Sequence, residues 1–277
     1  MEFSAAINGI QGTVSYRDED VQNIFIPLLR KWKTLHEQKD GRILVFLAAP
    51  PGTGKSTLLE FLRQLSRGEV PAAGLEPDGN VGHGTDGKTV NGGLSQESLA
   101  PITTIGIDGF HHYQDYLDTH TTVRDGKTIL MAKVKGAPET FDRDLLEKRI
   151  KAVAAGEDCS WPDYDRKIEN PREDVFRIGQ SSQIVVLEGN YLLLDMPGWR
   201  DLRKYADYTM KITADEAVLR ERLLQRRVRT GTPLEAAERF VDYSDMANAR
   251  LVLHHSGDAD LVLESGRDGY RIVHGEI

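Results

Sequence analysis

One run, Ala49-Pro50-Pro51-Gly52-Thr53-Gly54-Lys55-Ser56, constrains this chain more than any other stretch. It follows the apolar residues 43–47, typical of a buried strand, and precedes apolar residues at helical spacing from Leu58 to Leu65. A strand, a glycine-rich turn, Lys-Ser and a helix together hold phosphate, because the turn directs backbone N–H groups inward. Ala49 stands where the first glycine is expected, and alanine tolerates most conformations except positive φ. The sequence therefore predicts a phosphate-binding loop.

The side chains of this loop predict a site for a nucleotide triphosphate. Lys55 can reach the β- and γ-phosphates as a point charge, and the hydroxyl of Ser56 can ligate Mg²⁺. The residues expected to hold the cofactor are Pro51, Gly52, Thr53, Gly54, Lys55, Ser56 and Thr57.

Composition excludes several classes of protein. The chain has 277 residues, is 39% hydrophobic and 28% charged, and contains no apolar run of the roughly 18 residues that span a membrane. Its single cysteine, Cys159, excludes an intrachain disulfide and favours a reducing, cytoplasmic setting. The formal charge of −8 argues against a general nucleic-acid or membrane-surface binder. A small-molecule substrate is therefore expected, while the oligomeric state, a homodimer included, stays open.

Strand-like runs alternate with helical signals through the chain. The expected strands beyond 43–47 are 102–107, 184–187, 208–212 and 261–263, the last pairing with 270–273. Such alternation predicts the α/β class, with a doubly wound, mostly parallel sheet flanked by helices. Together with the loop it predicts a P-loop NTPase fold.

We expect one domain over residues 1–277, and its helices carry start signals. The N-terminal segment 1–40 should be helical, with apolar residues on one face of 18–38 and a kink or a start at Pro27. Residues 68–100 are poor in apolar side chains and indicate a flexible surface insertion.

A helical lid is predicted over residues 214–255. Thr213 and Glu216 have capping-box spacing at the start of a helix that runs to about Arg229, and Thr232-Pro233 opens the next one. Arg222 and Arg226 lie four residues apart and share a face, so either a solvated face or a pair that neutralises a transferring phosphoryl group fits.

Two carboxylates follow predicted strands, where ligands of parallel sheets bind. Asp108 can accept the proton of an attacking hydroxyl, or it can cap the Asp-Gly turn that it begins. Glu188 can hold Mg²⁺ directly or through water, or it can be a solvated strand end. The adjacent His111 and His112 point apart, so a substrate-side or structural role for His111 is favoured over a metal site.

Asp195-x-x-Gly198 has the form of a GTPase switch. However, the chain lacks the Asn-Lys-x-Asp signature for guanine, and this motif lies later than a small GTPase would place it. Adenine is the better prediction.

Four motifs jointly carry a resemblance. They are Asp108-Gly-Phe-His111, Lys135-Gly-Ala-Pro-Glu-Thr-Phe-Asp142, Pro162-Asp-Tyr-Asp-Arg166 and Leu187-Glu-Gly-Asn-Tyr191. In this order they resemble the phosphoribulokinase, uridine kinase and bacterial pantothenate kinase group of P-loop kinases. The likeness is greatest to the subgroup named fructose transport system kinases, or nucleoside/nucleotide kinase family proteins. It covers most of the chain outside the insertion.

The resemblance implies an ATP-dependent, Mg²⁺-requiring kinase. It assigns Asp108 as the general base and Glu188 as the acidic residue near the metal. Tyr164 and Arg166 align with substrate contacts of pantothenate kinase, which has histidine where Arg166 stands, so an anionic or polyhydroxyl acceptor is expected rather than pantothenate itself. Asn248 resembles an asparagine that lines the acceptor pocket. Lys135 either contacts phosphate or solvates its loop.

The function predicted from the sequence is transfer of the γ-phosphate to a small-molecule hydroxyl, of a sugar, a polyol, a pantothenate-like compound or a nucleoside. A uridine-kinase-like nucleoside kinase is the alternative within the same class. A nucleotide-hydrolysing switch or regulatory protein is the alternative from another class, although such a protein would not need Asp108 and the 135–142 loop.

Overall fold

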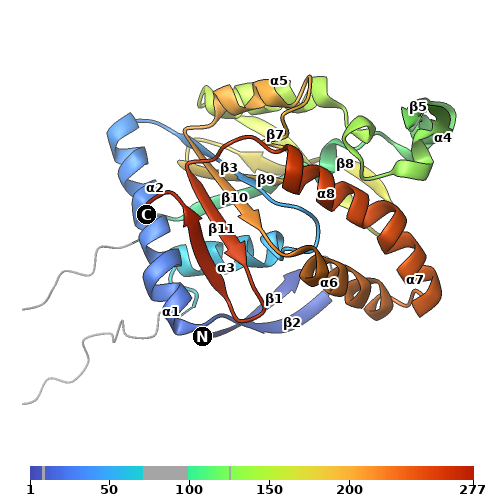
Figure 1. Cartoon of the computed structure of the whole chain (residues 1–277). Coiled ribbons are helices and arrows are strands. Elements are labelled where there is room, and N and C mark those ends of the chain that lie inside the picture. Colours follow the sequence, from blue (N-terminus) through green and yellow to red (C-terminus); the bar gives the residue numbers. More distant parts are fainter. Residues whose placement is uncertain (8–9, 71–98, 125) are drawn as a thin grey trace, which may run out of the picture.

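A six-stranded sheet forms the centre of the molecule in this computed structural model, which describes residues 1–7, 10–70, 99–124 and 126–277 (Figure 1). The strand order is β12-β11-β10-β3-β9-β4, and all neighbours are parallel except β12, which is antiparallel to β11. The bounds are β3 (Ile43–Ala48), β4 (Ile102–Gly106), β9 (Ile184–Gly189), β10 (Tyr208–Thr213), β11 (Leu261–Ser265) and β12 (Tyr270–His274). The predicted mostly parallel sheet is confirmed, as is the pairing of its last two strands.

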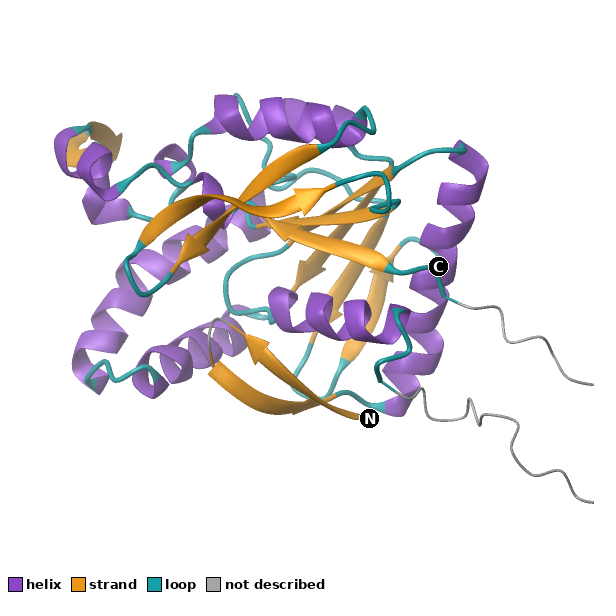
Figure 2. Cartoon of the chain, turned by 180° about the vertical axis from the view of Figure 1, so that it is seen from behind, coloured by secondary structure: helices purple, strands orange, loops and turns teal. Residues whose placement is uncertain are grey.

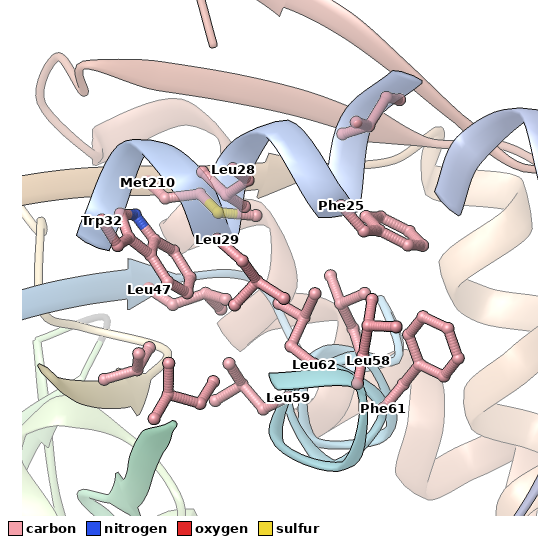
Figure 3. Close-up of a cluster of buried hydrophobic side chains, with 14 of the residues drawn as sticks. Phe25, Leu28, Leu29, Trp32, Leu47, Leu58, Leu59, Phe61, Leu62 and Met210 are labelled. Atoms are coloured by element: carbon pink, nitrogen blue, oxygen red, sulfur yellow. The ribbon is translucent and has the colours of Figure 1, made fainter. Parts of the chain in front are cut away.

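Helices cover both faces of this sheet (Figure 2). Every residue of β3 is buried, since alternate side chains enter two different cores. Val45 and Leu47 pack with α2 (Ile26–Lys39) and α3 (Lys55–Ser66), while Leu44 and Phe46 join the core beneath α5 (Arg143–Ala154). Figure 3 shows the first core, where Trp32 and Leu29 of α2 lie against Leu47, and Leu58, Phe61 and Leu62 extend it along α3.

The N-terminal segment differs in part from its prediction. Residues 18–39 are helical, as α1 (Asp18–Asp20), a π-helical turn (Val21–Phe25) and α2, and Pro27 stands in the first turn of α2. The residues before them form a hairpin of β1 (Glu2–Ile7) and β2 (Ile10–Ser15), so the prediction of a helical 1–40 was wrong for this part. Phe3 of the hairpin packs on Phe61, a tertiary contact that local periodicity cannot show.

The segment predicted to be a lid consists of α6 (Glu216–Arg229), α7 (Leu234–Phe240), a π-helical turn (Val241–Asp245) and α8 (Met246–His255), with a small core of its own. The predicted capping box was wrong, because Thr213 is the last residue of β10. Asp215 caps α6 instead, and its carboxylate accepts a hydrogen bond from the amide of Ala217. Helix α7 starts at Leu234 after Pro233, without a side-chain cap from Thr232.

Smaller elements surround this frame. Two hairpins, β5–β6 (Thr121–Arg124, Lys127–Leu130) and β7–β8 (Cys159–Asp165, Asn170–Ile178), were not predicted. Short helices include α4 (Gln114–Thr119) and 3₁₀ turns at 108–110, 131–134, 138–140 and 200–205. Residues 71–98 of the predicted insertion lie outside the described residues. Among the described helices, none has the length and apolarity to cross a bilayer.

Candidate active site

The loop between β3 and α3 has the backbone of a phosphate cradle. Gly52 and Gly54 adopt φ values of 88° and 84°, a region that side chains other than glycine rarely enter. Helix α3 begins immediately afterwards at Lys55. Because the first amides of a helix have no partner within it, the N-terminus of α3 offers N–H groups and a partial positive charge to an anion.

The packing of helix α6 is a second reason why position 52 needs glycine, besides its positive φ. A Cβ there would lie 3.0 Å from Cγ of Leu223 and 3.2 Å from the carbonyl oxygen of Leu219. The lid helix therefore packs directly on the loop, and any side chain at 52 would push the two apart.

Ser56, Lys55 and Glu188 form the polar floor of the site. The hydroxyl of Ser56 donates to Oε1 of Glu188 at 2.8 Å, and Nζ of Lys55 lies 3.8 Å from Oε2. Burial raises the pKa of Glu188, an effect that the charge of Lys55 opposes. Its Oε2 is buried and accepts no hydrogen bond from any described residue. A buried carboxylate oxygen without a hydrogen-bond donor, beside a hydroxyl, is a donor set that suits Mg²⁺.

Asp108 lies beside Glu188 because their strands are neighbours. Gly106 of β4 pairs with Glu188 of β9, and the amide of Ile107 donates to the carbonyl of Glu188 at 3.0 Å. Asp108 follows at once, in a 3₁₀ turn. Both carboxylates thus occupy the carboxyl edge of the sheet, where the sequence placed them.

Gly109 holds this turn against β7. A Cβ at 109 would lie 2.6 Å from the carbonyl oxygen of Pro162, a distance that real side chains do not adopt. The Asp-Gly pair thus reflects a close approach of two backbones. That approach brings Arg166, which follows β7, to the carboxylate of Asp108.

Cations surround Asp108. Nη2 of Arg166 lies 3.1 Å from its Oδ2, and each of the two side chains is about half exposed. Burial acts to raise the pKa of Asp108, but His111, which is protonated in the acid range where Asp108 titrates, and the charges of Arg166, Lys55 and Arg226 together lower it below its ordinary value. The Asp108 carboxylate is therefore ionised at neutral pH.

His111 packs between aromatic rings at the same turn. Its Nδ1 lies 2.8 Å from the carbonyl oxygen of Asp108, so Nδ1 carries the proton and Nε2 is left as an acceptor. The ring centroid lies 3.9 Å from that of Phe141 and 5.3 Å from that of Tyr164. Burial lowers the pKa of His111, which keeps the imidazole neutral near pH 7.

Lys135 joins three elements rather than extending into solvent. Its Nζ donates to Oε1 of Gln114 and to the carbonyl of Glu169, both at 2.7 Å, and lies 5.5 Å from the ring centroid of Tyr164. Burial lowers the pKa of Lys135. The cation is therefore tied to the loop between β7 and β8.

Asn248 is buried on α8 and approaches Gly136, where an added Cβ would lie 3.9 Å from its Nδ2. The carbonyl of Gly136 accepts a hydrogen bond of 2.6 Å from the hydroxyl of Tyr191. Asn190 precedes that tyrosine, and its buried Oδ1 has no hydrogen-bond donor among the described residues. Asn190 was not predicted as a site residue from the sequence, where its polar side chain two positions after Glu188 was the available signal.

A cleft of about 480 Å³ connects the floor of the site to the β7–β8 hairpin. Ser56, Asp108 and Glu188 line one side, while Tyr164, Arg166, Arg172, Val175 and Phe176 come from the hairpin and its turn. Sequence reasoning missed the hairpin wall after Arg166. The sequence between β7 and β8 contains no turn signal strong enough to predict that strand 170–178 folds back over the site.

The two predicted lid arginines separate. Arg226 contributes to the electrostatic field at Asp108. Arg222 instead donates to Oγ of Ser265 at 3.0 Å and to the carbonyl of Gly266 at 2.6 Å, after β11. Arg222 and Arg226 are four residues apart and share a helical face, but they interact with different parts of the protein.

Comparisons with known proteins agree with this geometry. No family model matches the chain. Uncharacterized protein YggC of Escherichia coli (strain K12) is 34% identical over 272 residues, which is 97% of this chain and 98% of that protein. The crystal structure of a "putative fructose transport system kinase" from Silicibacter sp. TM1040 is 30% identical and has a TM-score of 0.62, covering 80% of this chain and 89% of that one.

A third relative is "putative uridine kinase C227.14" of Schizosaccharomyces pombe (strain 972 / ATCC 24843), 28% identical over 254 residues, 90% of this chain and 91% of that protein. These relatives span 80% to 97% of this chain, and the two that are named as kinases match the group that the four sequence motifs indicate. With the glycine-rich cradle and the parallel sheet on which it sits, the chain belongs to the P-loop kinase family that includes phosphoribulokinase and uridine kinase.

Proposed function

We propose that this protein is an ATP-dependent kinase that transfers the γ-phosphate to a hydroxyl group of a small molecule. One observation carries the proposal: an ionised carboxylate, Asp108, lines the same cleft as Ser56 of the phosphate-binding loop. A proton acceptor close to the cradle is what a kinase needs and what a protein that only binds nucleotide does not.

The nucleotide end uses the loop from Pro51 to Thr57. Its backbone amides and Lys55 hold the phosphates, while Ser56 and Glu188 hold Mg²⁺. When bound, Mg²⁺ neutralises charge on the phosphate oxygens. The pKa of Glu188, raised by burial, means that protons and the metal compete for the same carboxylate.

The chemical step is an in-line displacement. The acceptor oxygen forms a bond to the γ-phosphorus as the bond to the β-phosphate oxygen breaks, and the hydroxyl proton passes to Asp108. Lys55 and Arg226 offset the negative charge that the transferring group carries. ADP and the phosphorylated acceptor leave, and Asp108 returns its proton to water.

The acceptor end is formed by His111, Lys135, Tyr164, Arg166 and Asn248. Arg166 already holds one anion, Asp108, so an acceptor that carries a carboxylate or a phosphate can exchange with that contact. His111 offers a neutral Nε2 that can accept a hydrogen bond from a second hydroxyl. An acceptor with several hydroxyls and an anionic group can bind both Arg166 and Nε2 of His111.

A nucleoside acceptor is the second candidate, favoured by the relative named as a uridine kinase and by the exposed Phe176 in the cleft wall. A planar base can pack against such a ring.

The test is ADP production by the pure protein with MgATP and a panel of sugars, sugar acids, sugar phosphates, polyols, pantothenate and nucleosides. We expect one class to raise the rate at least about tenfold above the rate without acceptor, as for a step governed by a positioned base. ADP release that no compound stimulates would support the switch alternative instead.

A further inference from the structure

Arg222 belongs to a hydrogen-bond network that contacts the phosphate-binding loop. Its guanidinium ties α6 to the end of β11, through Ser265 and the carbonyl of Gly266. Ser265 is 3% exposed, and its hydroxyl lies 3.4 Å from the carbonyl oxygen of Thr53. Thr53 is itself buried in the loop, and its own hydroxyl donates to the carbonyl of Pro50 at 3.0 Å. The Thr53 peptide is therefore held from both sides.

The network continues to the N-terminal hairpin. Tyr270 of β12 pairs with Ser265 of β11 in the sheet, and its ring centroid lies 6.1 Å from that of Tyr16, the residue that follows β2. Burial raises the pKa of both tyrosines, so both keep their protons and can act as donors. Figure 1 shows the end of β11 with the β1–β2 hairpin and α6 near it. Ser265 thus connects α6 to the phosphate-binding loop, and Tyr270 connects the N-terminal hairpin to Ser265.

We propose that Arg222 is a positioning residue for the phosphate-binding loop, acting through Ser265 on the Thr53 peptide, with Tyr16 and Tyr270 completing the network. Its charge does not face the carboxylate at which transfer is proposed; Arg226 does. In this assignment the lid helix and the N-terminal hairpin set the loop before nucleotide arrives. The inference needs only that the loop binds nucleotide phosphates, so it stands whatever the acceptor is.

Calorimetric titration with MgADP tests this without any acceptor. Arg222→Met keeps an unbranched apolar stem but loses the guanidinium donors, and we expect about tenfold weaker binding, the usual effect of losing a hydrogen bond made by a charged group. Ser265→Ala should weaken binding about threefold, as for a neutral hydrogen bond. Arg229→Met, at the exposed end of α6, is the matched control and should bind as the unmodified protein does.

The double variant decides between positioning and direct contact. If Arg222 acts through Ser265, Arg222→Met with Ser265→Ala binds MgADP about as weakly as Arg222→Met alone, because the two changes break one network. If Arg222 touched the phosphates itself, the two losses would multiply to about thirtyfold, which would overturn the proposal. Binding of MgADP by Arg222→Met at full affinity would overturn it as well.

Hydrogen exchange gives a second readout that does not depend on binding. In the nucleotide-free protein, amides of residues 52–57 should exchange faster in Arg222→Met and in Tyr16→Phe, while those of α5 should not change. Tyr16→Phe removes one oxygen atom and guards against the case in which the arginine variant fails to fold. Unchanged exchange in the loop of both folded variants would contradict a positioning role.

Discussion

The proposed nucleotide end and the proposed acceptor end of the site are built in different ways. The first comes from one continuous stretch, residues 51–57, and rests on backbone conformation at Gly52 and Gly54. The second gathers side chains from the 108–111 turn, the 135 loop, the β7–β8 hairpin and α8. Its charges are already engaged, Asp108 by Arg166 and Lys135 by Gln114. The proposed nucleotide end thus rests on a preset backbone, although Ser56 and Lys55 already contact Glu188, whereas the proposed acceptor end rests on side-chain contacts with which a ligand must exchange.

The largest expected effect comes from the acceptor end. Asp108→Asn should lower kcat by about 10²–10⁴, the usual contribution of a positioned base, because the amide cannot take the hydroxyl proton. Calorimetry should find MgADP affinity within about twofold of the unmodified value, since the cradle is made of other groups. Asp201→Asn, an exposed aspartate in the 200–205 turn, is the control. A collapse of nucleotide affinity with intact transfer would remove Asp108 from its proposed role.

Loss of the cation at the nucleotide end comes next. Lys55→Ala should reduce turnover by about 10²–10³, the effect of losing one group that stabilises developing charge. The substitution should also weaken the binding of MgADP. Because it leaves Glu188 buried without its neighbouring cation, it should raise the pKa of Glu188 further. Steady-state kinetics and calorimetry measure the two effects separately, with the exposed Lys127→Ala as control. Turnover near the unmodified value would contradict our account of the nucleotide end.

Backbone preorganisation predicts a smaller loss. Gly52→Ala forces a side chain into φ of 88° and against Leu223, and we expect MgADP to bind about tenfold more weakly, from the roughly 1–2 kcal/mol cost of that conformation. Gly231→Ala has a similar φ, 93°, but nothing within 4 Å of the new Cβ. That control should lose stability in thermal unfolding and keep its affinity. Equal affinities in the two variants would show that the cradle tolerates distortion.

The smallest effect concerns pH. Arg166 helps to lower the pKa of Asp108, so Arg166→Gln should raise it. Activity that needs ionised Asp108 is present above that pKa and is lost as pH falls through it, so the acid limb should move to higher pH in Arg166→Gln. The measurement is kcat/KM for the acceptor against pH, at saturating Mg²⁺ so that Glu188 stays ionised. An acid limb that does not move would mean that Arg166 serves only to bind the acceptor.

Sequence patterns predicted the nucleotide end more fully than the acceptor end. Gly52, Gly54, Lys55 and Ser56 are close together in the chain, so their spacing is enough to predict their relative positions. Asp108 and Glu188 were placed at strand ends because parallel strands present their carboxyl ends at one edge. The cleft wall formed by β7 and β8, and the buried Oδ1 of Asn190 without a hydrogen-bond donor, could not be predicted from the sequence, because both depend on contacts between distant segments.

The errors have the same physical origin. Thr213 and Glu216 have the spacing of a capping box, but β10 extends through Thr213 because it pairs with β11, and Asp215 then takes the cap. Arg222 and Arg226 share a helical face by spacing, yet what each one meets depends on how α6 packs.

By itself the sequence determined the α/β class, the phosphate cradle and the two carboxylates at the sheet edge, since these follow from local conformation and from the order of strands. Only the tertiary structure decided that Arg166 faces Asp108, that α6 requires glycine at position 52, and that Tyr16 packs near Tyr270, the sheet partner of the Ser265 that contacts Thr53. Such contacts join residues far apart in the chain, and packing, rather than any periodic signal, selects them.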